Sequence, residues 1–191
     1  MSKPTPSRIA AQLPNLISLA RAGLAVPVCL LLMQGSPQAI WLALALFTMA
    51  AATDFVDGAV ARRMHATSIL GSHLDPLADK VLVGAPLAII PFTQAAVFAA
   101  PVIIALAGFV LAEGSMAWRR IDLLRQGEAL PASPAAKWKT AAEYLGVAAV
   151  IAGLAPVPWD TGLQVAGSAV VVLAGGYAWL RRGKNVAKGE R

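Results

Sequence analysis

Six apolar stretches of about twenty residues each constrain the fold of this chain more than any other feature. They cover roughly residues 14–34, 39–63, 70–92, 95–118, 136–155 and 161–181. Each has about the ~20 residues that an α-helix needs to cross a bilayer. Hydrophobic residues make up 58% of the 191 positions and charged residues 14%, so a soluble core of this size would not bury all the apolar surface. The sequence therefore predicts an all-α integral membrane protein with six transmembrane helices.

The same composition excludes two other classes of protein. Disordered chains are poor in hydrophobic residues, whereas this chain is rich in them. A disulfide scaffold needs several cysteines, and Cys29 is the single cysteine of the sequence.

Basic residues alternate along the chain in a way that predicts its topology. The connections at 34–38, 92–94 and 155–162 contain no Lys or Arg. On the opposite side lie 14 of the 16 basic residues, and the other two, Arg21 and Lys80, fall inside predicted spans. The positive-inside rule then predicts that both termini are cytoplasmic. The net charge of +6 is mostly this topology signal, so we expect no nucleic-acid partner.

We predict three segments. Residues 1–13 form a polar N-terminal segment, which is either a short interfacial helix or a frayed tail. Residues 14–181 form the six-helix domain, and residues 182–191 form a basic cytoplasmic tail. A bacterial inner membrane is expected, because the residues before the first span do not resemble an Arg-rich transit segment.

Acidic residues gather in the predicted spans. Six of the ten lie inside the spans or at their ends: Asp54, Asp57, Asp75, Asp79, Glu113 and Glu143. Four unpaired aspartates at the bilayer centre would cost on the order of 10 kcal/mol, at ~2.5–3.5 kcal/mol each. Arg21 and Lys80 are too few to neutralise all of them, so divalent cations are the economical partner. Hard oxygen ligands favour Mg²⁺, Mn²⁺ or Ca²⁺ over zinc.

The spacing of the aspartates predicts one shared site. In the second span the positions i, i+3, i+4 and i+7 fall on one helical face and hold Asp54, Asp57, Gly58 and Ala61. Asp75 and Asp79 are four residues apart on one face of the next span, which we expect to be an antiparallel neighbour. Gly58 and Ala61 leave room for a flat ligand, and Arg62 could bind a phosphate. Spacing alone leaves three alternatives open: metal-dependent catalysis, a proton or cation path, and buried structural pairs.

This segment resembles the signature of the CDP-alcohol phosphatidyltransferases. Eight fixed positions match with the family's gaps across 26 residues: Asp54, Asp57, Gly58, Ala61, Arg62, Gly71, Asp75 and Asp79. The resemblance implies a six-helix membrane enzyme that transfers a phosphatidyl group from CDP-diacylglycerol to an alcohol and releases CMP. It also implies a homodimer surrounded by membrane lipids. A cation transporter is the distant alternative, in which four signature residues would have no evident role: Gly58, Ala61, Arg62 and Gly71.

The resemblance also assigns roles to the signature residues. Two ions, Mg²⁺ or Mn²⁺, would be held by Asp54, Asp57 and Asp75, with Asp79 sharing one of them. Such ions would neutralise the pyrophosphate and stabilise the leaving CMP. Asp79 would be the general base on the acceptor hydroxyl. The CDP pocket would be lined by six residues of the signature: Asp54, Asp57, Gly58, Ala61, Arg62 and Gly71.

Three further segments resemble particular branches of the family. Residues 74–80 read Leu-Asp-Pro-Leu-Ala-Asp-Lys, which is similar to phosphatidylglycerophosphate synthases and eukaryotic-type cardiolipin synthases. Residues 136–140 read Ala-Lys-Trp-Lys-Thr and are similar to a Gly-Lys-x-Lys-Thr stretch of members that use glycerophosphate. The favoured acceptor is therefore sn-glycerol 3-phosphate; cardiolipin synthesis or another acceptor alcohol is the alternative. The predicted acceptor-binding residues are Lys137, Lys139 and three residues of 14–21, a stretch that also resembles this branch: Asn15, Ser18 and Arg21, which lie on roughly one helical face.

The fourth span departs from the pattern of the glycerophosphate-using members. They commonly carry an Arg-Glu pair there, whereas residues 103–113 contain Glu113 but no arginine. Either the acceptor differs, or its phosphate is bound by Lys137, Lys139, Arg119 or Arg120. We expect Lys80 to pair with an aspartate or to extend to the interface, and Glu143 and Tyr144 to face other helices. The roles of Glu113, His65 and His73 stay open.

Overall fold

The computed structural model describes residues 8–64, 71–93, 99–125 and 134–187, and within these ranges the chain forms α-helices, one short 3-10 helix and no strand. The helices are α1 (Arg8–Gln34), α2 (Pro37–Met64), α3 (Gly71–Ile89), η1 (Ile90–Phe92), α4 (Ala99–Arg125), α5 (Pro134–Ala152) and α6 (Asp160–Ala187). Side chains are described for residues 19–53, 78–93, 99–118 and 138–180 and for Ile121, Asp122 and Arg125. Each predicted span overlaps one α-helix, and the third also includes η1, which confirms the all-helical prediction. The first and last helices extend beyond the predicted spans, into the segments 1–13 and 182–191.

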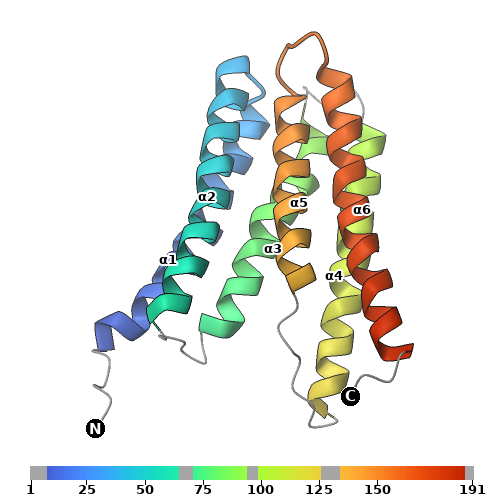
Figure 1. Cartoon of the computed structure of the whole chain (residues 1–191). Helices are drawn as coiled ribbons and strands as arrows, with labels where there is room; N and C mark the ends of the chain where they lie inside the picture. The colour runs from blue at the N-terminus through green and yellow to red at the C-terminus, as the bar shows by residue number, and fades with distance from the viewer. Residues whose placement is uncertain (1–7, 65–70, 94–98, 126–133, 188–191) are drawn as a thin grey trace, which may run out of the picture.

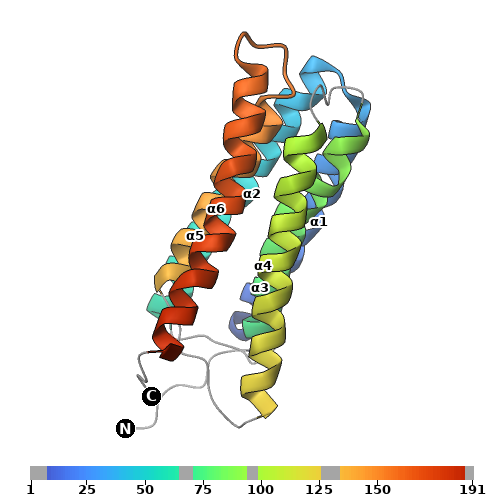
Figure 2. The same ribbon diagram turned by 90° about the vertical axis from the view of Figure 1, so that its right-hand side faces the viewer.

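The helices lie side by side in an elongated bundle (Figure 1). One end of the bundle contains the beginnings of α1, α3 and α5 and the ends of α2, α4 and α6. The most extensive packing joins α5 to α6, α1 to α2 and α3, and α4 to α6 (Figure 2). In the described part of the chain, α2 and α3, which carry the signature, do not pack extensively against each other. Instead, α1 and α5 each contact both of them.

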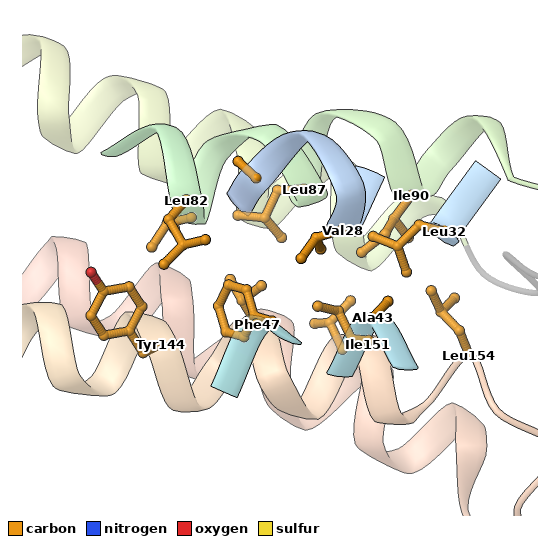
Figure 3. Packing of buried hydrophobic residues seen from close by; sticks show 14 of the residues in the cluster. Val28, Leu32, Ala43, Phe47, Leu82, Leu87, Ile90, Tyr144, Ile151 and Leu154 are labelled. Carbon is orange, nitrogen blue, oxygen red and sulfur yellow. The ribbon is translucent and has the colours of Figure 1, made fainter. Parts of the chain in front are cut away.

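The centre of the bundle is a continuous apolar core to which all the helices contribute. Figure 3 shows part of it, with Phe47 of α2 and Leu82 of α3 near Tyr144 of α5. The largest side chains that are fully buried in it are Val28, Leu32, Ile40, Phe47, Leu82, Val83, Leu87, Ile90, Val102, Val147 and Ile151. Close packing of this kind sets the position and rotation of each helix against its neighbours.

A tight turn joins α1 to α2. Gly35 has a φ of 68° and donates its N–H to the carbonyl of Leu31 at 3.4 Å, which ends α1 in the left-handed conformation that favours glycine. Ser36 caps α2, because its hydroxyl accepts a hydrogen bond from the N–H of Ala39 at 3.3 Å. Pro37 then occupies the first helical position, where its missing N–H costs nothing. These three residues make α1 and α2 an antiparallel pair.

Glycines bring α5 and α6 into backbone contact. A Cβ atom on Gly146 would lie 2.8 Å from the carbonyl oxygen of Gly167, and one on Gly153 would lie 2.7 Å from Cγ of Gln164. Small residues allow this approach between membrane helices. The amide nitrogen of Gln164 also donates a hydrogen bond to the carbonyl of Gly153 at 2.6 Å, which satisfies a carbonyl at the end of α5.

A substitution at this contact should destabilise the protein. We expect Gly146→Val to lower the melting temperature of the purified protein by several degrees, because overpacking typically costs about 1–3 kcal/mol. The matched control is Gly176→Val in α6, where a Cβ atom would have no neighbour within 4 Å. Equal melting temperatures for the two variants in a thermal unfolding assay would contradict the proposed contact.

Large apolar side chains also cover the outside of the bundle. Leu30 is 62% exposed, Leu111 73% and Trp118 72%. Soluble monomers rarely expose large contiguous apolar surfaces. By length and composition, Ala99–Trp118 and Asp160–Leu180 are two helices of the described part that could cross a membrane. The structure is therefore consistent with a membrane protein, and the six-span topology stays a prediction.

Candidate active site

The signature runs from the last turns of α2 into α3. The α2 part holds Asp54, Asp57, Gly58, Ala61 and Arg62, and the α3 part holds Gly71, Asp75 and Asp79. Except for Asp79, their side chains lie outside the described residues, as do those of Asn15, Ser18, Arg119, Arg120, Lys137, His65 and His73. The predicted metal and CDP sites therefore stay predictions. Asp79 is the signature residue whose side-chain contacts the structure describes.

Asp79 is held by two donors from two other helices. Its Oδ1 accepts a hydrogen bond from Nη1 of Arg21 in α1 at 2.8 Å. The same oxygen accepts one from the hydroxyl of Tyr144 in α5 at 3.0 Å. The Asp79 side chain retains 22% exposure, whereas that of Arg21 retains 2%. Donors from two helices thus orient the carboxylate, while the Asp79 side chain stays partly exposed. Arg21, which we predicted to bind the acceptor, lies against the predicted base.

A second set of ion pairs begins one residue further along α3. Nζ of Lys80 lies 2.8 Å from Oε2 of Glu113 in α4. Glu113 also pairs through Oε1 with Lys139 of α5, and Nζ of Lys139 lies 3.0 Å from Oε1 of Glu143 one turn later. Glu113 is therefore one carboxylate partner of Lys80, and the expected pairing of Lys80 with an aspartate stays a prediction. Glu113, whose role the sequence left open, joins α3 and α5 to α4.

Together these residues form what we call the charged cluster: Arg21, Asp79, Lys80, Glu113, Lys139, Glu143 and Tyr144. It contains three cations and three carboxylates, so its formal charges cancel. Such balance is expected, because an unpaired charge in an apolar interior is very costly. The cluster connects α1, α3, α4 and α5 beside Asp79, the predicted base. Lys139, a predicted phosphate ligand, is 7% exposed and lies between two carboxylates.

Sequence reasoning named every residue of the charged cluster but did not predict which of them pair. The spacing of Lys139 and Glu143 is i, i+4, a separation that commonly gives a salt bridge on a helix, so this pair could have been found. No local sequence pattern could have predicted the contact between Tyr144 and Asp79, because the two residues are 65 positions apart. We expected Glu143 and Tyr144 to face other helices; both are buried, and Tyr144 reaches α3.

The residues of the signature fit a hard divalent cation by their donor chemistry. Asp54, Asp57, Asp75 and Asp79 offer carboxylate oxygens alone, which Mg²⁺ and Mn²⁺ prefer over sulfur or imidazole. Among the described side chains no group of three or more His, Cys, Asp or Glu could hold a metal ion. The assignment of metal ions to Asp54, Asp57, Asp75 and Asp79 therefore stays a prediction.

Comparison with known proteins shows the family of this chain. A family model described as CDP-alcohol phosphatidyltransferase matches residues 11–179. The chain belongs to the CDP-alcohol phosphatidyltransferase family. The match begins in α1 and ends in α6, so it covers all the helices and not the signature alone. The resemblance that the signature carried is confirmed, and the protein is an enzyme of phospholipid biosynthesis.

Individual relatives within the family carry two different names. A CDP-diacylglycerol–glycerol-3-phosphate 3-phosphatidyltransferase of Bacillus subtilis is 34% identical over 153 residues, which are 73% of this chain and 76% of the relative. One of the same name from Cereibacter sphaeroides is 33% identical over 142 residues, 74% of this chain and 63% of the relative. A cardiolipin synthase (CMP-forming) of Rattus norvegicus is 44% identical over 72 residues, 37% of this chain and 23% of the relative.

Proposed function

We propose that this phosphatidyltransferase uses CDP-diacylglycerol as donor and sn-glycerol 3-phosphate as acceptor, with phosphatidylglycerophosphate and CMP as products. The names of the relatives from B. subtilis and C. sphaeroides support this acceptor. The single structural observation that carries the chemistry is the carboxylate of Asp79, partly exposed and oriented by Arg21 and Tyr144. A hydroxyl nucleophile needs such a base within hydrogen-bond reach.

In the proposed reaction, Asp79 takes the proton of the acceptor hydroxyl. The resulting oxygen forms a bond to the phosphorus that bears diacylglycerol, and the bond from that phosphorus to the oxygen of CMP breaks. Bound Mg²⁺ or Mn²⁺, two ions in our proposal, would neutralise the pyrophosphate and stabilise the leaving group. Asp54, Asp57 and Asp75 would hold these ions, with Asp79 sharing one of them.

The remaining signature residues and the basic residues would bind the two substrates. We assign the CDP pocket to Asp54, Asp57, Gly58, Ala61, Arg62 and Gly71. The acceptor phosphate would be bound by Lys137 and Lys139, with Asn15, Ser18 and Arg21 nearby on α1. The pairing of Arg21 with Asp79 supports the placement of this face of α1 beside the base. It follows that α1, α2, α3 and α5 together would enclose the substrates.

The proposal includes a membrane setting. We propose six spans in a bacterial inner membrane, with both termini and the active site facing the cytoplasm. The alternation of connections with and without basic residues supports this topology. The helix ends agree with it, because α1 begins and α6 ends at the end of the bundle that holds the signature turns of α2 (Figure 1). A homodimer, which the family resemblance implies, completes the proposal.

The acceptor is tested by CMP release. We expect purified protein with CDP-diacylglycerol and Mg²⁺ or Mn²⁺ to release CMP rapidly only when sn-glycerol 3-phosphate is added. Parallel reactions contain phosphatidylglycerol, inositol phosphate or no acceptor. Rapid release with phosphatidylglycerol would overturn the proposed acceptor and favour cardiolipin synthesis, which the R. norvegicus relative makes the second candidate. Folded protein that is silent with every acceptor, and conducts ions in proteoliposomes, would contradict the proposal altogether.

A further inference from the structure

We infer that Tyr144 is a positioning residue for Asp79, holding the carboxylate in the orientation in which it takes the acceptor proton. The inference rests on the proposed function, because it presupposes that Asp79 is the base. Tyr144 lies in α5 and outside the signature, 65 positions from Asp79. It is also outside the set of residues that the sequence assigned to substrates or ions.

Packing against Phe47 in the core fixes the position of the Tyr144 ring. Tyr144 is 4% exposed and Phe47 is fully buried. The two rings pack edge to face, with centroids 6.1 Å apart and planes at 75°. Aromatic pairs prefer this arrangement. Figure 3 shows the Tyr144 ring beside Phe47 and its hydroxyl turned away from the rest of the core. A buried tyrosine hydroxyl needs a polar partner, and Asp79 is such a partner here.

The two donors on Oδ1 contribute differently. Arg21 supplies a positive charge, whereas Tyr144 supplies a neutral hydrogen bond from the opposite helix. Because both meet the same oxygen, they restrict rotation of the carboxylate about its side-chain bonds. A charge without the second donor would still attract the carboxylate but would leave its orientation less determined. Small displacements of a catalytic group are expensive, since about 1 Å can cost ~10²-fold in rate.

Phe47 connects this contact to the other half of the signature. It lies in α2, two turns before Asp54 on the same helix. The ring contact therefore ties α2 to α5, and the hydroxyl ties α5 to α3. Extensive direct packing between α2 and α3 is not seen in the described part of the chain. Tyr144 thus bridges the two helices that carry the eight signature positions.

The test is Tyr144→Phe, which keeps the ring and its contact with Phe47 and removes only the hydroxyl. We expect kcat to fall by about 10–100-fold, while the KM values for both substrates stay within about twofold of native. The melting temperature and the binding of CDP-diacylglycerol should stay native-like. The matched control is Tyr177→Phe in α6, a half-exposed tyrosine, which should leave all four quantities unchanged. An unchanged kcat in Tyr144→Phe would overturn the inference.

A double variant distinguishes a failure of this inference from a failure of the proposed function. In protein that already carries Asp79→Asn, Tyr144→Phe should lower the residual rate by less than twofold, because residues that act through one group are not additive. A full additional loss there would overturn the positioning role while leaving the proposed base intact. If Asp79→Asn alone kept native activity, the base assignment would fail, and the inference would fail with it for that separate reason.

Discussion

Asp79→Asn is expected to lower kcat for CMP release by about 10²–10⁴-fold, the usual contribution of a positioned general base. Asparagine has the same shape and still offers an oxygen to Arg21 and Tyr144, so the local contacts should persist. It cannot take up a proton from the acceptor hydroxyl. The binding of CDP-diacylglycerol should change little, because the CDP pocket that we propose consists of other residues.

Two measurements make this prediction specific. The rate is compared with that of Asp122→Asn, an exposed aspartate near the end of α4, which should retain native turnover. Donor binding is measured separately, with CDP-diacylglycerol in the absence of acceptor. Native turnover in Asp79→Asn would remove Asp79 as the base. A loss of donor binding equal to the loss of rate would instead assign Asp79 to the donor site.

Lys139→Met is expected to have the largest effect on stability. Lys139 is buried and contacts both Glu113 and Glu143. Without it, Glu113 retains Lys80, but Glu143 loses the cation on its own helix. Removal of one partner from a buried ion pair costs about 3–5 kcal/mol. For a chain of this size we expect the melting temperature to fall by on the order of 10 °C.

A double variant tests the reason for this loss. Lys139→Met combined with Glu143→Met removes one cation and one carboxylate together and leaves the Lys80–Glu113 pair, whose atoms are 2.8 Å apart. We therefore expect the double variant to regain most of the lost stability, since apolar replacements of buried pairs are often neutral. Arg125→Met, at an exposed cation, is the matched control. A native melting temperature in Lys139→Met would contradict the stabilising role of these ion pairs.

The helices and the signature could be predicted because both depend on the spacing of residues that lie close together in the sequence. Apolar stretches of about twenty residues predict helices wherever they occur, and each of the six coincides with a helix of the structure. The signature from Asp54 to Asp79 spans only 26 residues, so its gaps are visible without any knowledge of packing. The family match over residues 11–179 agrees with that reading.

The helical architecture, the family and the candidate base could be predicted from the sequence, because they depend on residues close together in the chain. Tertiary structure decided the partners of that base and of the lysines. Arg21 and Tyr144 meet at Asp79, and Lys80 meets Glu113, across separations that no helical period relates. Which side chains meet between helices depends on how each helix is rotated and how closely it approaches its neighbours. Contacts such as that between Gly146 and Gly167, and the filling of the common core, set those quantities, and only the folded chain contains them.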